Sequence, residues 1–249
     1  MTPPRAARTR TPKTKSRAHE RVTHAAENYL LSLFVLREEG AWPTPAQLAD
    51  CIRRLPAGEG LGTSLPSVLG MVRRIAKEGL VEVSQEHRVS LTSRGQAVAE
   101  DVVRRHRLAE RMVVDILGLD LHKAHMEAHR LEHGISPDVE AKIRERLGNP
   151  TTSPFGHPIP GSGYREPSEK RLTMNNGEPG HVYLVDRIPE EDEQLLQFLV
   201  EHAVVPGQQV TVVEAGHYRG VITFRVAQKE AALGLEAASR IWLQESSKK

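Results

Sequence analysis

Helix start and stop signals divide the first hundred residues and confine this part of the chain to short helices. Thr44 and Ser64 each precede a helix-forming run, where a hydroxyl oxygen can accept a hydrogen bond from a backbone N–H of the first turn. Gly40 and Gly79 follow such runs and favour a helix end. Together with the spacing of apolar residues, these signals predict three successive helices, over residues 27–39, 44–55 and 64–79.

A short ribbon is predicted after the third helix. Residues 80–92 (LVEVSQEHRVSLT) are typical of two strands around a turn at 85–88. Three helices followed by such a ribbon form the winged helix-turn-helix pattern, in which the third helix enters the major groove of DNA. A helical bundle with an ordinary hairpin is the alternative interpretation. We expect DNA contacts from the caps, the third helix and the wing, namely Thr44, Ser64, Ser67, Arg74, Lys77, His87 and Arg88.

Charge is distributed unevenly, although the formal net charge is only +2. Residues 1–18 carry basic side chains, many Pro and Thr, and no acidic group before residue 19. We expect a disordered basic tail, which either has no task or strengthens DNA binding through phosphate contacts. The sequence has no apolar run of membrane-spanning length, and the single Cys51 cannot form an internal disulfide. A cytoplasmic protein without membrane contact is therefore expected.

The middle of the chain is predicted to be helical and the last third rich in strands. Apolar spacing predicts helices over 95–117, 121–135 and 136–148. A Pro- and Gly-rich stretch follows over 149–179 and predicts an extended linker. Beyond it, a small β-barrel of SH3-like type is expected. Its elements are predicted as strands over 181–188, 208–215, 220–226 and 238–244, with a helix over 190–202.

Histidines and carboxylates repeat at helical spacing in this middle region. In RRHRLAER, His106 and Glu110 are four residues apart, and HMEAHRLEH repeats histidine every four residues. Side chains at i and i+4 leave the same face of a helix, so one helix can offer two preoriented donors to a divalent cation. A solvated face of charged pairs is the alternative. Because so many donors fall in register on neighbouring helices, we predict at least one metal site and expect two.

Three motifs connect the pattern to a known family. RRHRLAER, GLDLHKAHMEAHRLEH and SPFGHPIPG, in this order behind a winged helix, resemble the diphtheria-toxin-repressor family of iron- and manganese-dependent regulators. The resemblance runs from about residue 23 to 161 and extends to the barrel. It implies a homodimeric repressor that binds palindromic operator DNA when loaded with metal. The implied division is a winged-helix domain over 19–95, a metal-binding and dimerisation domain over 96–165, a linker over 166–180 and an SH3-like, FeoA-type domain over 181–249.

The resemblance also implies two metal sites per protomer. The ancillary site corresponds to His106, Glu110 and His125, with Glu191 and Gln194 as the nearest candidates from the barrel. The primary site corresponds to Asn28, His129, Glu132 and His133.

Two primary-site positions depart from the iron-type pattern. Iron-type members carry a cysteine and a methionine where this chain has His129 and Asn28. Nitrogen and oxygen donors are harder than sulfur, so the departure favours Mn(II), with Fe(II) still possible. Asn28 offers only a neutral amide oxygen, and Glu27 and His24 lie close enough along the helix to substitute for it.

Two other classes of function remain open at this point. A metal-dependent hydrolase with a DNA-binding head would need a nucleophile or base beside an open metal position. The sequence has no HExxH motif, and no phosphate-binding loop or Ser/His/Asp set stands out. We therefore expect no enzyme activity and no catalytic residue. An adaptor protein, in which the histidines form only a solvated face, is the third interpretation.

Overall fold

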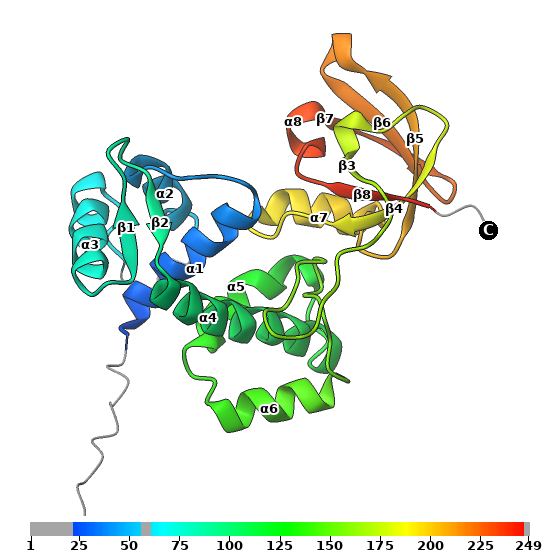
Figure 1. Ribbon diagram of the computed structural model, residues 1–249. Coiled ribbons are helices and arrows are strands. Elements are labelled where there is room, and N and C mark those ends of the chain that lie inside the picture. Colours follow the sequence, from blue (N-terminus) through cyan, green and yellow to red (C-terminus); the bar gives the residue numbers. More distant parts are fainter. Residues whose placement is uncertain (1–21, 56–60, 247–249) are drawn as a thin grey trace, which may run out of the picture.

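The computed structural model describes residues 22–55 and 61–246, so the predicted basic tail over 1–18 lies outside the described residues. The described chain has three parts (Figure 1). A head of three helices and a ribbon lies beside a layer of helices, and a β-barrel lies against the other end of that layer. No helix in these two ranges is both long enough and apolar enough to cross a membrane.

The head has the predicted winged-helix order. Thr44 caps the second helix through the Gln47 backbone N–H, and Ser64 caps the third through that of Ser67. The first helix begins almost a turn earlier than predicted because the Thr23 hydroxyl caps it. The elements are α1 (His24–Glu38), α2 (Pro45–Ile52), α3 (Leu65–Lys77), β1 (Val81–Val83) and β2 (Val89–Leu91), with the two strands antiparallel.

Helix α1 is apolar on two faces and therefore belongs to two cores. One face places Leu30 and Leu33 in the head core with residues of α2, α3 and the ribbon. The other places Leu31 and Val35 against Val102 of the helical layer. A helix buried on two sides cannot turn within one core without disturbing the other, so α1 ties the head to the layer.

The helical layer consists of α4 (Ser93–Arg111), a π-helical turn (Met112–Ile116), α5 (Leu121–Glu132) and α6 (Pro137–Arg146). The single helix predicted over 95–117 is thus divided by the π-helical turn, and the segment ends at Gly118 as expected. Near its start, Gly95 is packed so closely that a Cβ there would lie 1.8 Å from the carbonyl oxygen of Leu80. Only glycine permits this approach of α4 to the end of the head.

The prediction of an extended linker over 149–179 is wrong in two places. Phe155 of SPFGHPIPG is fully buried in the barrel core, and Thr152 forms a bridge with Pro158, so this motif is a packed corner. Strand β3 (Arg171–Thr173), inside the stretch expected to be linker, pairs with the last strand of the barrel. Proline and glycine counts indicated a chain without regular helices, but they could not reveal that it packs.

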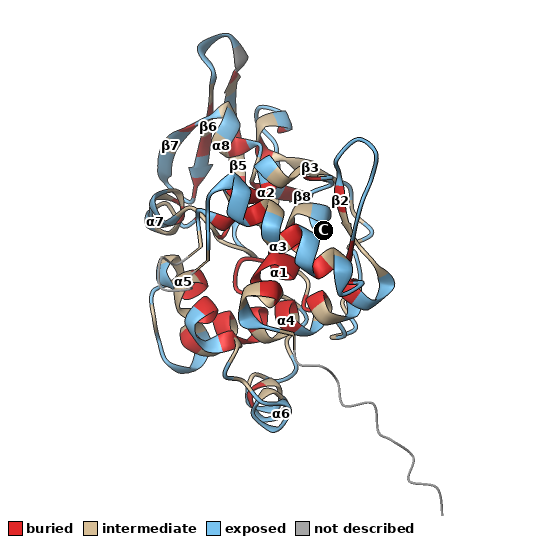
Figure 2. Ribbon diagram, turned by 90° about the vertical axis from the view of Figure 1, so that its left-hand side faces the viewer, coloured by how far each residue is buried: buried red, intermediate tan, exposed pale blue. Residues whose placement is uncertain are grey.

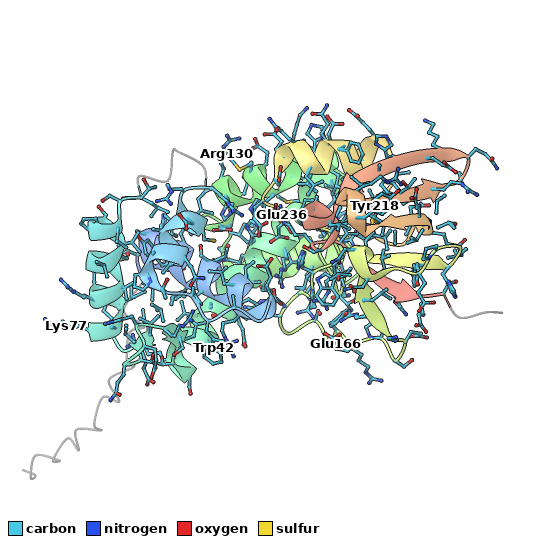
Figure 3. All side chains as sticks on the ribbon, turned by 90° about the horizontal axis from the view of Figure 1, so that it is seen from above. Trp42, Lys77, Arg130, Glu166, Tyr218 and Glu236 are labelled. Atoms are coloured by element: carbon cyan, nitrogen blue, oxygen red, sulfur yellow. The ribbon has the colours of Figure 1, made fainter. Side chains whose placement is uncertain are left out.

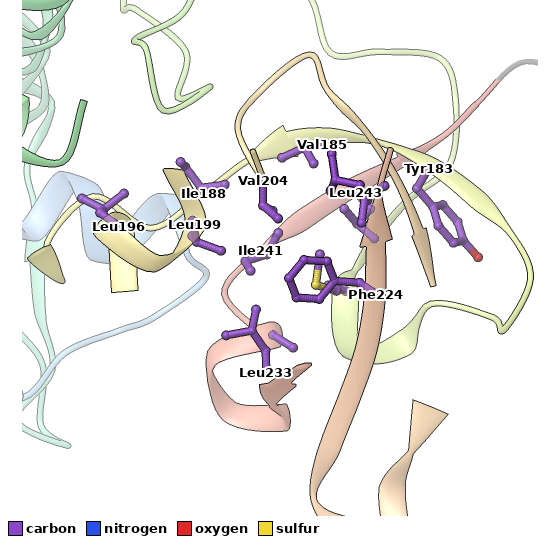
Figure 4. Close-up of a cluster of buried hydrophobic side chains, with 14 of the residues drawn as sticks. Tyr183, Val185, Ile188, Leu196, Leu199, Val204, Phe224, Leu233, Ile241 and Leu243 are labelled. Atoms are coloured by element: carbon purple, nitrogen blue, oxygen red, sulfur yellow. The ribbon is translucent and has the colours of Figure 1, made fainter. Parts of the chain in front are cut away.

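The barrel is a six-stranded sheet in the order β3-β8-β4-β5-β6-β7, which confirms the SH3-like prediction. Strand β7 was not predicted, because KEAALG lacks the β-branched and aromatic residues typical of strands. Figure 4 shows part of the core, which extends from Leu196 and Leu199 of α7 to Phe224 and Leu243 of the sheet. The further elements are β4 (Val182–Arg187), α7 (Glu193–Glu201), β5 (Gln209–Gly216), β6 (Val221–Val226), β7 (Lys229–Gly234), α8 (Leu235–Ala238) and β8 (Trp242–Glu245).

Helix α7 of the barrel packs against α5 of the helical layer. The chain enters α7 through the segment Pro189–Asp192, and this contact therefore places the acidic residues of that segment beside the histidine-bearing helices.

Candidate metal centre

Helices α4 and α5 bring the predicted histidines and glutamates together inside the protein. His106 and Glu110 lie one turn apart on α4, and both are buried, with 2% and 0% of their surfaces exposed. Helix α5 faces them with His125, His129 and Glu132, which are also buried. Figure 2 shows buried segments, in red, on both α4 and α5. Burial of so many ionisable groups is costly unless they are paired or bind a cation.

Three donor atoms converge on one point. Nε2 of His106 lies 2.9 Å from Oε1 of Glu110 and 3.1 Å from Nδ1 of His125, and the last two atoms are 3.2 Å apart. A cation that binds each donor at about 2.1 Å holds neighbouring donors roughly 3 Å apart. The spacing therefore fits three ligands on one face of a divalent cation.

The barrel adds a fourth donor, Glu190, from the segment before α7. Its carboxylate belongs to the same group as His106, Glu110 and His125, all of whose donor atoms lie within 4.8 Å of one another. Glu190 is only 3% exposed. Sequence reasoning missed it, although the acidic run that begins at Glu190 was the signal.

The two barrel residues predicted as ligands are not brought into this group. Glu191 turns toward Arg240, whose Nη2 lies 3.2 Å from its carboxylate. Gln194 is exposed on α7. Glu190 is thus the barrel carboxylate that the structure places among the donors of the helical layer, and spacing alone could not indicate this, because it does not reveal the turn before α7.

The polar atoms left without hydrogen bonds fit a cation. Oε2 of Glu110, Oε1 of Glu132, Oε2 of Glu190 and both ring nitrogens of His129 are buried, and none has a hydrogen-bond partner among the described residues. Buried polar atoms in proteins are nearly always paired. Lone pairs on oxygen and imidazole nitrogen are what Mn(II), Fe(II) and similar cations bind, so the residues present fit such a group.

A second set of donors surrounds Glu132. Its Oε1 lies 3.5 Å from Nδ1 of His129 and 3.4 Å from Nε2 of His133. Asn28 of α1 reaches the same place, with Oδ1 3.1 Å from Nε2 of His133. The structure therefore brings together the four residues predicted for the primary site.

His106 links the two sets. While Nε2 faces Glu110 and His125, Nδ1 lies 2.5 Å from Oε2 of Glu132. Burial alone lowers the pKa of His106, but Glu110 and Glu132 outweigh it and raise the pKa well above its ordinary value. Burial likewise raises the pKa of Glu132, but His106 outweighs this and brings it down to about 2. In the protein without metal, the cluster thus holds a proton where a cation would supply positive charge.

The predicted DNA contacts on the third helix lie on its exposed side. Ser64 and Ser67 are exposed at the start of α3, with their hydroxyl oxygens 2.9 Å apart. Arg74 pairs with Glu78 at 3.0 Å. Lys77 projects from the outer edge of the head, away from the barrel (Figure 3). Arg73 is exposed on the same helix and was not among the predicted contacts.

The remaining predicted contacts lie at the wing and at the start of α2. His87 is at the tip of the ribbon, with a positive φ of 57°. Arg88 donates to the carbonyl oxygen of Trp42 at 2.7 Å, so it fastens the wing to the loop before α2. Thr44 and Gln47 form a capping box. The Thr44 hydroxyl oxygen therefore already accepts a hydrogen bond from the backbone N–H of Gln47.

A winged-helix head, a helical layer with a buried His/Glu cluster and an SH3-like barrel together define the class of metal-responsive transcriptional regulators. Residues 92–161 match the family described as "Iron dependent repressor, metal binding and dimerisation domain", and residues 172–245 match the FeoA domain.

Individual proteins agree with this class. The iron-dependent repressor IdeR of Mycobacterium tuberculosis (strain ATCC 25618 / H37Rv) is 39% identical over 199 residues, which are 75% of this chain and 82% of that protein. The diphtheria toxin repressor of Corynebacterium efficiens is 37% identical over 226 residues, 86% of this chain and 94% of that protein. A solved manganese-dependent transcriptional repressor in complex with manganese is 28% identical, with a TM-score of 0.76 over 89% of this chain and all of that one.

The chain belongs to the family of iron- and manganese-dependent transcriptional repressors. Its similarity to repressors gives no support to the alternative of a metal-dependent hydrolase. The structure of the manganese regulator SloR, 25% identical with a TM-score of 0.72 over 89% of this chain and 98% of that one, has the same fold.

Proposed function

We propose that this protein is a cytoplasmic homodimer that represses transcription by binding a palindromic operator when Mn(II), or alternatively Fe(II), occupies two sites in each protomer. The observation that carries the proposal is the set of buried carboxylate and imidazole atoms that lack hydrogen bonds within the described chain. Nitrogen and oxygen donors without sulfur favour manganese. The similarity to a manganese-dependent repressor supports the same preference.

The first site would be held by His106, Glu110, His125 and Glu190, and the second by Asn28, His129, Glu132 and His133. A bound cation would supply the positive charge that balances these carboxylates. The residues themselves orient the donors: Glu132 accepts from Nδ1 of His106 at 2.5 Å and so fixes the ring with Nε2 toward the first site.

The two sites would act on the head through α1. Asn28 belongs to α1, whose other face lies in the head core. Farther along, the fully buried Arg107 of α4 donates to Glu38 at the end of α1 and to the carbonyl oxygen of Pro158. Any preference of the cation for one placement of α1 therefore shifts the population of head positions, which is the thermodynamic linkage a metal-dependent repressor needs.

We assign residues 19–95 to DNA binding and 96–165 to metal binding and dimerisation. The exposed start of α3, with Ser64 and Ser67, would face base edges, and Arg74 and Lys77 would face phosphates. His87 and Arg88 at the wing and Thr44 at the start of α2 would contact the backbone. In a symmetric dimer, two such heads read half-sites separated by whole turns of DNA.

The decisive experiment selects duplexes from a random-sequence pool with the Mn(II)-loaded protein and measures affinity for the recovered sequence by fluorescence anisotropy. We expect a palindromic sequence, loss of binding with EDTA, and recovery with added Mn(II). Fe(II) under anaerobic conditions is expected to restore binding at higher concentrations than Mn(II). Sequence-specific binding that persists at full strength in EDTA would refute metal dependence.

A further inference from the structure

A small cavity lies beside the first metal site, which we call the buried site (His106, Glu110, His125 and Glu190). Its volume is about 20 Å³, and two donors of that site, His125 and Glu190, line it together with His129. The head supplies most of the remaining wall, with Leu31, Ser32 and Val35 of α1, Cys51 of α2, and Arg54 and Leu55 just after α2. The cavity therefore separates the head from the donors on α5 and before α7.

A larger cleft, of about 700 Å³, lies between the head and the barrel and borders this cavity. Exposed residues such as Asp50 line the cleft, so it opens to solvent. Four residues line both spaces and therefore form the boundary between them, namely Val35, Cys51, Arg54 and Glu191. We call these four residues the gate. We propose that a divalent cation enters and leaves the buried site through the cleft and the gate, an inference that rests on the proposed function of that site.

The small cavity is too narrow for a hydrated ion. A cavity needs about 10–15 Å³ to hold one water molecule, so the space beside His125 holds roughly one. A divalent cation in solution carries several water molecules, and it must lose most of them or find the gate wider. Three gate residues belong to the head, whereas Glu191 belongs to the barrel segment before α7. The gate therefore widens when the head moves away from that segment, and such movement sets the rate of metal exchange.

Cys51 forms part of the gate wall and is not a ligand. It is partly exposed, and it belongs to none of the described groups of donors that lie within 4.8 Å of one another. A larger side chain at this position obstructs the gate, and a smaller one widens it. Either change alters the barrier between the bound and the free cation, so uptake and release change by the same factor while the Kd stays constant.

The two charged gate residues act on a passing cation in opposite directions. Glu191 attracts the cation, whereas Arg54 repels it. Neither belongs to a described group of converging donors, so their charges affect the passage more than the bound state. Loss of the Glu191 charge therefore slows exchange, and loss of the Arg54 charge accelerates it. A purely structural role for the two residues gives no reason for opposite signs.

The test measures exchange of Mn(II), the probe, in the full chain. Titrations followed by the electron paramagnetic resonance signal of the free ion give the Kd. Stopped-flow mixing of the loaded protein with an excess of a chromogenic chelator gives the release rate, and the two together give the uptake rate. Cys51→Leu should slow both rates by about tenfold and Cys51→Ala should accelerate both several-fold, with Kd values within about twofold of the wild type. Ala46→Leu is the matched control, because it adds bulk at an exposed position of α2 that lines neither space.

Glu191→Gln and Arg54→Gln test the gate through charge without enlarging or shortening a side chain inside the small cavity by much. Glu191→Gln should slow both rates several-fold, and Arg54→Gln should accelerate both. The two effects should shrink as the salt concentration rises, because salt screens exposed charges.

Two outcomes would overturn the proposed route. One is wild-type rates in both Cys51 variants and both charge variants. The other is a change in release alone, with a matching change in Kd, which means that these residues act on the bound state and not on the passage. Failure of the proposed function looks different, because the wild type would then show no tight class of bound Mn(II) at all. Tight binding with rates that ignore the gate refutes the route and leaves the buried site intact.

Discussion

The buried site and the group of His24, Glu27 and His133, which we call the junction cluster, are built from the same residue types at similar spacing, but they differ in their access to water. The four donors of the buried site, His106, Glu110, His125 and Glu190, are at most 6% exposed. At the junction cluster, His24 is exposed and Glu27 and His133 are partly exposed. In the buried site, Oε2 of Glu110 and Oε2 of Glu190 have no hydrogen-bond partner among the described residues, whereas both oxygens of Glu27 face a partner within 3.0 Å.

The comparison teaches that burial, more than spacing, decides how strongly a His/Glu set needs a cation. An exposed carboxylate is stabilised by water whether or not a metal is present, so a cation gains little by replacing that water. A buried carboxylate has no such alternative, and the free energy of its burial adds to the preference for the metal-bound state. A cation would therefore add more stability to the buried site than to the junction cluster.

The largest expected effect is that of removing His106, because this ring serves both buried donor sets. His106→Ala should weaken the tightest Mn(II) binding by at least about a hundredfold, since loss of even an outer-sphere partner commonly costs 10- to 100-fold. Operator binding at a fixed Mn(II) concentration should fall with it. Isothermal titration calorimetry and anisotropy check both. His122→Ala, on α5 but outside the described metal-ligand groups, is the control and should retain wild-type affinity.

Helical spacing was enough to predict which donor side chains of each helix lie close together. His106 and Glu110 follow the i, i+4 rule, as do the histidines of α5, and the structure brings all of them to one face. Spacing could not predict Glu190, because its position depends on how a separate domain docks on α5. Spacing also could not predict which of the two clusters is more buried, since the exposure of His133 and Glu27 depends on the packing of α1 against α5.

The fold was predictable to a similar extent. The N-cap residues Thr44 and Ser64 predicted the starts of two helices of the head. Strand and turn patterns predicted most of the strands of the barrel. The π-helical turn after Arg111 was not predicted, because the apolar residues keep the spacing of an α-helix through this segment. Phe155 was read as linker, because only the tertiary fold shows that its ring enters the barrel core.

A second prediction concerns the pH dependence of stability in the metal-free protein, where a buried histidine differs from an exposed one. Burial, helped by His106, lowers the pKa of His129 from its ordinary 6.5 to about 4. The unfolded chain thus takes up this proton at higher pH than the folded one. Stability from His129 is therefore complete above pH 6.5 and lost as the pH falls toward 4, by about 2 kcal/mol between pH 6.5 and 4.5.

Neighbouring groups do not cancel this loss. The raised pKa of His106 stabilises the fold fully below pH 6.5 and adds nothing more as the pH falls further. Glu132, with its pKa lowered to about 2, loses its contribution only below pH 4.5. Urea midpoints in EDTA should therefore fall from pH 6.5 to 4.5 in the wild type and stay flatter in His129→Gln. Equal slopes for the two proteins would show that His129 is not the group responsible.

A third prediction uses two adjacent acids with different surroundings. Glu190→Gln should weaken the tightest Mn(II) binding by about tenfold, because it removes a buried, negatively charged donor. Glu191→Gln should leave that binding unchanged, since its carboxylate faces Arg240 at a partly exposed surface, where an ion pair contributes about 1 kcal/mol or less. The same calorimetric titration compares them. The reverse order of effects would restore Glu191 as the ligand.

The smallest expected effect comes from the side-chain amide of Asn28, which lies beside His133 of the junction cluster. Asn28 is 1% exposed and its Oδ1 lies 3.1 Å from Nε2 of His133, so Asn28→Asp would place a carboxylate among the donors around Glu132. Added ligand charge strengthens the binding of hard cations, and we expect Mn(II) to bind this class several-fold more tightly. The metal-free variant should in turn unfold at lower urea concentration, because its new buried charge lacks a cation. Asn176→Asp adds the same charge at an exposed position on the barrel and should change neither quantity. If Asn28→Asp leaves Mn(II) affinity at the wild-type value while destabilising the metal-free protein, Asn28 is a hydrogen-bond partner of His133 and not a ligand.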